Sequence, residues 1–443
     1  MHRIRRSDRV LHPTLRRRGF TSPAVAIALL IVMMGLALII DRIWLETAKL
    51  ELMTAAEAAA LGAAAELASD DLLVPNSSVD LRVSNALQTA DWIASQNFVC
   101  GSPVTLNTEP EGDVLFGNLV QEPMGIQFLE SSTNPNTVVV TTLRTRSNNN
   151  PIALFVTGAT GLPYGDVAAR VEASVNNDVV GLRSISGSPI PALPIAIWQV
   201  DPSGQRADTW NNLIESNQGS DNYSFDPDTH TVTAGPDGIS EMVIHSAPTA
   251  GNQSNPNFQL VDIGTGLNNT ELTRQIQSGL SVDDLQVWGG AIWLGQGVTL
   301  SLTCSPQFDS TQVTAFENLI GQRRVCFLYS TIAMQQSNGT SSQQSSAGTA
   351  TCTEIVAIRI LAVSQNADGS CSVTIQPTVM TTRTAILSSE STNPATDDAT
   401  DLYTTDSFDA PTNSNGTSIG NFPSTTTTNA APNRYVYKLR LTH

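Results

Sequence analysis

Cysteine is the residue type in this chain whose spacing most directly suggests chemistry, because paired thiols outside the cytoplasm oxidise to disulfides. Four of the five cysteines, Cys304, Cys326, Cys352 and Cys371, fall in the last third of the chain. Cys352 and Cys371 bracket a predicted β-hairpin, and Cys304 and Cys326 flank a predicted helix, so these are the natural pairs. Four cysteines allow three connectivities, and the sequence does not choose among them. Cys100 is left over, either as a buried thiol or as half of an intermolecular bridge.

Histidine and aspartate give weaker signals. His230 and His245 could face each other across a predicted hairpin spanning residues 229–245, which favours cross-strand pairing over a metal or catalytic pair. Three aspartates in or beside that hairpin are Asp226, Asp228 and Asp237. They could help to bind calcium, but their order lacks the glycine position of an EF-hand loop, and solvated turn acids are the simpler interpretation.

Signatures of known catalytic chemistry are scarce. The chain has no His-Glu-x-x-His, phosphate-loop or Ser-x-x-Lys string, and no Cys-x-x-Cys or His-Cys spacing of a zinc site. We therefore expect a non-enzymatic protein with no cofactor and no metal.

Charge is segregated along the chain. Residues 1–42 contain eight arginines and two aspartates, a balance of +6, whereas the remainder contains 15 basic and 38 acidic residues, a balance of −23. An acidic body of this kind argues against nucleic-acid binding. Only 14% of residues are charged, and the chain is rich in Ser, Thr, Asn and Gly, which is typical of β-rich exported proteins.

A membrane anchor must hold that body in place. Ala24–Ile40 is an unbroken apolar run, extended by Phe20 to Pro23, and a bilayer core needs about 20 apolar residues in a helix. We predict a transmembrane helix over residues 20–43 behind a basic cytoplasmic tail, residues 1–19. Basic residues stay on the cytoplasmic side, so the protein is expected to be single-pass, with its body extracytoplasmic or on the cell surface. A cleaved signal peptide is the alternative, although no small-residue cleavage site follows the run.

The helix is predicted to continue as an alanine-rich stalk over residues 44–70. Pro23 suits the first helical position and no other proline follows before residue 69, so one helix would extend about 70 Å at 1.5 Å per residue. Small or apolar residues recur every three or four positions on one face of the stalk. This alanine seam consists of Met53, Ala56, Ala60, Ala63 and Leu67. Small residues let another backbone approach closely, so the seam packs either on the chain's own body or on helices of other subunits.

The order of these features carries a family resemblance. A basic tail ending in Arg18-Gly19, the apolar run, Asp41-Arg42 and the string Ala-Ala-Glu-Ala-Ala-Ala-Leu-Gly-Ala-Ala at 55–64 follow one another. The segment resembles the N-terminus of TadE/TadG-like proteins of the tight-adherence (Flp) pilus-assembly system, which carry a comparable Ala-Asp-Ala-Ala-Ala-Leu-Ala segment beyond their anchor. The resemblance implies an assembly subunit whose partners are the membrane and other appendage subunits, or itself through the N-terminal helix.

The body is more loosely similar to the exported bodies of TadE/TadG-like proteins from planctomycete-type bacteria. The strings that carry this similarity lie at 193–197, 321–325, 375–377 and 435–441.

Two departures from the family refine the expectation. Type IV prepilins are cut between residues like Gly19 and Phe20 and need a glutamate five residues past the cut, where this chain has Ala24. A retained anchor is therefore favoured over a processed pilin. Some TadG-like proteins also contain a von Willebrand A domain with an Asp-x-Ser-x-Ser metal motif. The nearest string, Asp262–Gly266, lacks both serines, so that domain is not predicted.

Periodicity in the body predicts an α+β fold: the long helix, then a β-rich body with a few short helices. Helices are predicted at 79–95, from Asn269 to Gly279, from Ser281, and from Ser310 to Gly321. Strands are predicted at 136–146, 167–175, 298–304, 324–330, 353–363, 371–376 and 435–442, whereas Ser188–Ile197, with three prolines, indicates an edge segment or a connection. The body divides into a β-rich part at 71–265 and an α+β part at 266–443, with low-complexity loops at 335–350 and 388–433.

The function that follows is a membrane-anchored structural or assembly subunit of a surface appendage, resembling a pseudopilin or minor pilin. It would act by helix packing and protein–protein contacts. The alternative is a membrane-anchored adhesion or binding module, and an anchored hydrolase is a weaker third choice.

Overall fold

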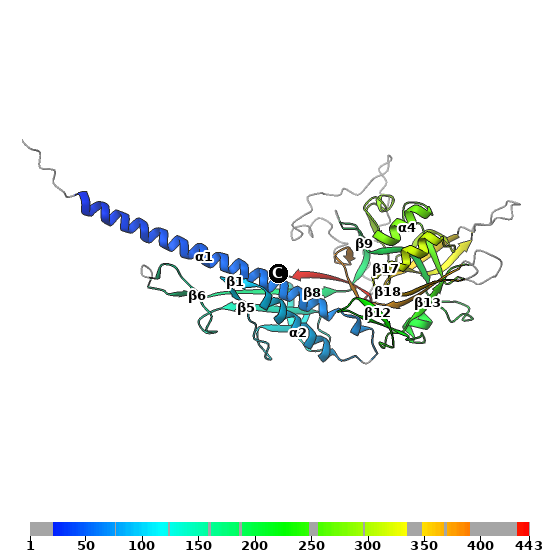
Figure 1. Cartoon of the computed structure of the whole chain (residues 1–443), viewed down its shortest axis with the longest axis horizontal. Helices are drawn as coiled ribbons and strands as arrows, with labels where there is room; N and C mark the ends of the chain where they lie inside the picture. The colour runs from blue at the N-terminus through cyan, green and yellow to red at the C-terminus, as the bar shows by residue number, and fades with distance from the viewer. Residues whose placement is uncertain are drawn as a thin grey trace, which may run out of the picture.

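The structure is a computed structural model in which a long helix leads into an elongated, β-rich body (Figure 1). It describes residues 21–75, 77–122, 125–157, 161–185, 188–247, 256–295, 297–334, 348–366, 370–389 and 432–442. The α+β fold class predicted from the sequence is confirmed. The basic tail, Gly19, Phe20 and most of the two predicted low-complexity loops lie outside the described residues.

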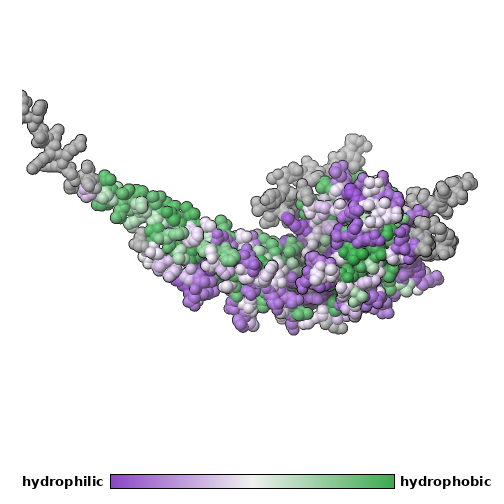
Figure 2. Space-filling view, in the orientation of Figure 1, coloured by the Kyte–Doolittle hydropathy of each residue, from purple (hydrophilic) through white to green (hydrophobic). Residues whose placement is uncertain are grey.

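Helix α1 (Thr21–Leu67) is a single unbroken helix of 47 residues, as the absence of internal proline predicts. Among the described residues it is the only helix long and apolar enough to cross a membrane. Its first half stands clear of the body and exposes an apolar surface, whereas its second half lies along the body (Figures 1 and 2). The helix ends at Leu67, and a short 3-10 turn, η1 (Asp70–Leu72), follows.

The second half of α1 packs on helix α2 (Val79–Gln96), which confirms the predicted second helix, and on a six-stranded sheet. The strand order is β20 (Met380–Thr381), β22 (Val436–Thr442), β8 (Val167–Asn176), β5 (Thr137–Arg144), β3 (Val114–Glu122) and β4 (Gly125–Glu130). Alternate residues of β8 from Val167 to Val175 are buried on the face that α1 covers, because side chains alternate between the two faces of a strand. The last strand of the chain, β22, thus returns to the sheet that holds the stalk.

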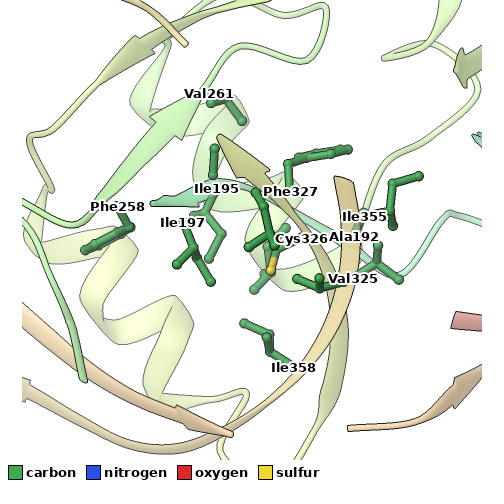
Figure 3. Packing of buried hydrophobic residues seen from close by; sticks show 14 of the residues in the cluster. Ala192, Ile195, Ile197, Phe258, Val261, Val325, Cys326, Phe327, Ile355 and Ile358 are labelled. Carbon is green, nitrogen blue, oxygen red and sulfur yellow. The ribbon is translucent and has the colours of Figure 1, made fainter. Parts of the chain in front are cut away.

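A second, seven-stranded sheet forms the far end of the body. Its order is β13 (Met242–His245), β19 (Cys371–Pro377), β18 (Gly348–Gln365), β16 (Leu300–Ser305), β14 (Phe258–Val261), β10 (Ala192–Trp198) and β17 (Arg323–Met334). Strand β17 also pairs with β18, which closes five of the strands into a barrel and removes free edges there. Side chains of β10, β14, β17 and β18 pack together around Cys326 (Figure 3). The sheet draws strands from both sides of residue 265, where the sequence suggested a division.

The sequence-based interpretation of Ser188–Ile197 as an edge or connection is wrong, because β10 pairs on both sides, with β14 and with β17. The register shifts between Ala192 and Ala196, and Pro194 lies within that irregularity. A bulge leaves one residue out of the ladder, so a proline without an N–H is tolerated in an inner strand.

Smaller elements complete the body. Helices α4 (Asn269–Ser278) and α5 (Ser310–Glu317) match their predictions, with Asn268 and Asp309 as N-caps. No α-helix starts at Ser281, where Ser281 and Asp284 bond each other in a turn before η3 (Gln286–Trp288). The remaining paired segments are β1 (Phe98–Val99) with β2 (Ser102–Pro103), β6 (Ile152–Ala153) with β7 (Tyr164–Gly165), β11 (Tyr223–Asp226) with β12 (Thr231–Ala234), and β9 (Val179–Arg183) with β15 (Ala291–Trp293) and β21 (Ala385–Leu387).

Candidate functional site

The most extensive functional surface that the sequence singled out, the alanine seam, is buried inside the chain itself. Ala56, Ala60 and Ala63 are fully buried, Leu67 is 3% exposed, and Met53 is half-buried against the same apolar cluster. That cluster also contains alternate residues of β8 and the alanine face of α2. Of the two interpretations left open by the sequence, the structure therefore shows the seam packed on the chain's own body.

Close approach of α1 and α2 depends on small residues on both helices. Ala86, Ala90 and Ala94 recur at intervals of four along α2 and are fully buried. A Cβ atom at Gly62 would lie 2.1 Å from Cδ1 of Ile93, so glycine is required for this spacing unless Ile93 moves.

Polar contacts fix how α1 lies on the body. Thr142 on β5 donates its hydroxyl proton to the carbonyl oxygen of Leu52 at 3.1 Å, and the N–H of Cys100 donates to the Glu51 carboxylate at 2.9 Å. At the C-terminal end, the buried Arg82 guanidinium donates to the carbonyl oxygen of Leu67 at 3.4 Å, where an unpaired carbonyl needs a donor. These bonds set the position of α1 along its axis, which apolar packing alone does not.

Asp70, at the end of the stalk, connects the N-terminal helix to the far sheet. One carboxylate oxygen accepts from the Arg359 guanidinium at 2.8 Å, and the other accepts from the Thr378 hydroxyl and the Val379 N–H, both at 2.7 Å. Arg359 lies on β18 and Thr378 follows β19. The residue that ends the stalk is therefore bonded to strand β18 and to the segment that directly follows its neighbour β19.

Arg359 is itself almost fully buried, with 1% of its surface exposed. Besides Asp70 it donates to the carbonyl oxygen of Gly321 at 2.9 Å, and its guanidinium carbon lies 3.5 Å from the ring centre of Phe225. Burial lowers the pKa of Arg359 from its ordinary value, an effect that the neighbouring Asp70 opposes. A buried cation needs such partners, because removing either member of a buried pair leaves an uncompensated charge.

The predicted disulfides are wrong, because all five cysteines are free thiols. Four lie on strands of the seven-stranded sheet, yet none has another cysteine as its cross-strand partner. The partners are Val261 and Gly348 for Cys304, Val356 for Cys326, Leu300 and Tyr329 for Cys352, and Gln365 for Cys371. Burial raises the pKa of Cys352 to about 12 and of Cys371 to about 11, which makes both thiols poor nucleophiles.

The predicted 229–245 hairpin is also wrong. Strand β12 pairs with β11 through a turn that Asp226 caps, and β13 pairs with β19 instead. His230 therefore lies in the β11–β12 turn beside Phe225, while His245 lies 3.8 Å from Asp208. Within the described part of the chain, no three residues among His, Cys, Asp and Glu gather as metal ligands.

A shallow groove of about 330 Å³ lies between α1 and α2. It is lined by Glu66, Asn85, Gln88, Thr89 and Trp92. Trp92 is 64% exposed, and polar side chains surround it. The groove has the character of a protein-contact surface rather than an enclosed site for a small molecule.

Sequence reasoning missed the Asp70 and Arg359 contact. The two residues are 289 positions apart, and Ser69-Asp70-Asp71 looks like an ordinary helix end. One signal was available, since Arg359 is the single charge in the apolar run from Ile355 to Val363. A lone cation in a fully buried strand needs a partner elsewhere in the chain.

Comparison with known proteins agrees with the stalk geometry. Residues 19–66 match the Tad family, described as "Putative Flp pilus-assembly TadE/G-like". The match thus ends one residue before α1 does, and it includes both the exposed apolar half and the packed half of the helix. No curated protein and no solved structure matches the chain.

Proposed function

We propose that the chain is a membrane-anchored assembly subunit of an Flp-type pilus system, and that it acts as a rigid rod-and-body unit outside the cytoplasm. The TadE/G-like segment and the apolar helix that it contains support a membrane-anchored, pilus-related protein. The more specific role as a rod-and-body assembly subunit depends on how the second half of that helix packs on the rest of the chain.

Burial of the alanine seam is the observation that carries the proposal. A subunit that assembled with its neighbours through the alanine seam would need that face free for their helices. Here Ala60 and Ala63 contact the chain's own α2 and sheet, and releasing them would expose the apolar cluster beneath. Burial of apolar surface stabilises by roughly 25 cal/mol per Å², so such release is costly.

The remaining exposed surface of α1 defines where partners can bind. The half from Pro23 to Ile40 is apolar and exposed, which suits lipid and the helices of other membrane subunits. The acidic body and the groove beside Trp92 would meet partners outside the membrane. The arginine-rich tail supports an orientation with the N-terminus in the cytoplasm.

We further propose that the role is not enzymatic. The His245 imidazole lies 3.8 Å from Asp208, and Arg206 holds the same Asp208 in a bidentate ion pair. That arrangement suits a structural contact. A Gly-x-Ser-x-Gly string occurs once in the sequence, at residues 416–420, outside the described residues. Its Ser/Thr/Asn-rich surroundings lack the strand and helix patterns of a nucleophile elbow.

Deletion of the gene in its own organism tests the proposal. We expect fewer surface pili, counted by electron microscopy, while the pilin itself is still made. Complementation with the wild-type chain should restore pili, and Ala60→Leu should restore fewer, because the stalk no longer packs on the body. Normal pili in the deletion strain would contradict the proposal, and normal pili with lost surface attachment would indicate an adhesion module instead.

A further inference from the structure

The hairpin formed by β6 and β7 lies against α1 where its apolar run ends. The backbone N–H of Phe155 donates to the Asp41 carboxylate at 2.9 Å, and the rings of Trp44 and Phe155 meet edge to face with centres 5.1 Å apart. The side chain of Leu45 abuts Gly165, where an added Cβ would lie 2.6 Å from Cδ2 of Leu45. The hairpin is thus held to the helix by three contacts within two turns.

The depth of this contact is set by α1. Between Pro23 and Ile40, Ala37 is the only buried side chain, and it lies one turn before Asp41 on the same helical face. The rest of the chain therefore begins to cover α1 at Ala37, inside the apolar run. Twenty residues of helix span about 30 Å, so Ala37 and Asp41 fall at the outer boundary of the bilayer core.

The hairpin presents apolar and aromatic side chains at that depth. Phe155, Leu162 and Tyr164, here called the aromatic patch, are 64%, 56% and 46% exposed. Residues 151–165 contain no charged residue, although the body is strongly acidic. The nearest flanking charges, Arg146 and Asp166, are paired with each other at 3.0 Å.

Backbone bonding also fits a lipid environment, in which unsatisfied N–H groups are expensive. The N–H of Leu154 donates to Pro163 at 3.1 Å, and that of Gly161 donates to Thr157 at 2.9 Å. The N–H of Phe155 is bonded to Asp41. This bond pairs Asp41 Oδ1 directly after the apolar run, whereas Asp41 Oδ2 is buried without a hydrogen-bond partner among the described residues.

We propose that the aromatic patch inserts into the outer interface of the membrane that α1 spans, so that the body is held at two points and at a fixed tilt. Continuity with α1 identifies lipid as the occupant, since aromatic rings favour this boundary and apolar surface can lie several ångströms into it. The absence of charge in residues 151–165 means that insertion should not depend on anionic lipid. The inference rests on the membrane anchoring of the proposed function.

Collision measurements on spin labels test the inference in the full chain, reconstituted in nanodiscs of palmitoyl-oleoyl-phosphatidylcholine. Single labels are placed by Leu162→Cys, Thr157→Cys, Ile31→Cys and Val287→Cys, each in a Cys100→Ser background. Oxygen concentrates in lipid and a nickel chelate stays in water. The label at Leu162 should collide mainly with oxygen, as the one at Ile31 does, whereas the one at the distant Val287, 62% exposed, should collide mainly with nickel. Thr157→Cys gives a second reading that removes no apolar side chain.

The outcomes distinguish whether water, lipid or a protein partner contacts the aromatic patch. Nickel collisions at Leu162 and Thr157 equal to those at Val287 would overturn the inference, provided that Ile31 remains in lipid. Low collision with both reagents would indicate a protein partner on the patch and would also overturn it. Nickel collisions at Ile31 would instead contradict the anchor itself, and with it the proposed function.

Discussion

Removal of the Arg359 guanidinium should destabilise the protein more than any exposed charge change. Arg359→Met deletes the 2.8 Å ion pair with Asp70, the bond to Gly321 and the stacking on Phe225. Breaking a buried pair by removing one partner costs about 3–5 kcal/mol. We place the loss near the lower limit, about 3 kcal/mol, because Asp70 keeps Thr378 and Val379 as donors and is partly exposed to water.

Thermal unfolding of the detergent-solubilised full chain, followed by circular dichroism, measures this loss. Arg170→Met on the exposed side of β8 is the matched control and should change stability by less than about 0.5 kcal/mol. A double-mutant cycle with Asp70→Asn should show a coupling of about 1–3 kcal/mol, because the two side chains share one contact. Additive effects of the two changes would refute the reasoning that this pair joins the stalk to the far sheet.

Three further predictions follow from packing and ionisation. Ala60→Leu should lower the free energy of unfolding, measured by chemical denaturation, by about 1–3 kcal/mol through overpacking. Leu50→Ala, on the exposed face of the same helix, is the control and should have little effect. Equal effects of the two substitutions would contradict the packed stalk. Burial raises the pKa of Asp237 in the folded protein, so its ionised form costs stability at neutral pH and that cost disappears as the pH falls. Asp237→Asn should therefore raise the melting temperature at neutral pH, with a gain that shrinks toward the ordinary aspartate pKa of about 3.9; a gain that is independent of pH would exclude this cause. Alkylation of the purified chain without reductant should leave the four sheet cysteines unmodified until denaturant is added and then label all five, and a mass that reveals a disulfide would disprove the free-thiol assignment.

Local patterns in the sequence were sufficient for elements whose signals are periodic and uninterrupted. The proline-free run after Pro23 predicted α1, and alternating residues at 167–175 predicted β8. The helices predicted from Asn269 and from Ser310 begin where α4 and α5 begin. Each of these signals involves only residues that are close together along the chain, so it can be read from the sequence without the structure.

Long-range pairing was where sequence reasoning failed. Cysteines near each other along the chain suggested bridges, but strand register places other residues opposite them. Pro194 suggested an edge strand because a bulge that tolerates proline cannot be seen without the partner strands. The Asp70 and Arg359 contact joins segments that share no local signal. The register of the strands and the long-range partner of each segment could therefore be determined only from the structure.

The stalk half of α1 packs on the chain's own body and leaves no free seam. Thiol accessibility in intact membranes tests it most directly, with Ala60→Cys and Leu50→Cys compared in a Cys100→Ser background. Ala60 is fully buried and Leu50 is 67% exposed, so a membrane-impermeant maleimide added from outside should label Leu50→Cys and leave Ala60→Cys unlabelled. Oxidation should yield no dimer through Ala60→Cys. Rapid labelling of Ala60→Cys, or its oxidation to a crosslinked dimer, would show that the seam is open to solvent or to other subunits.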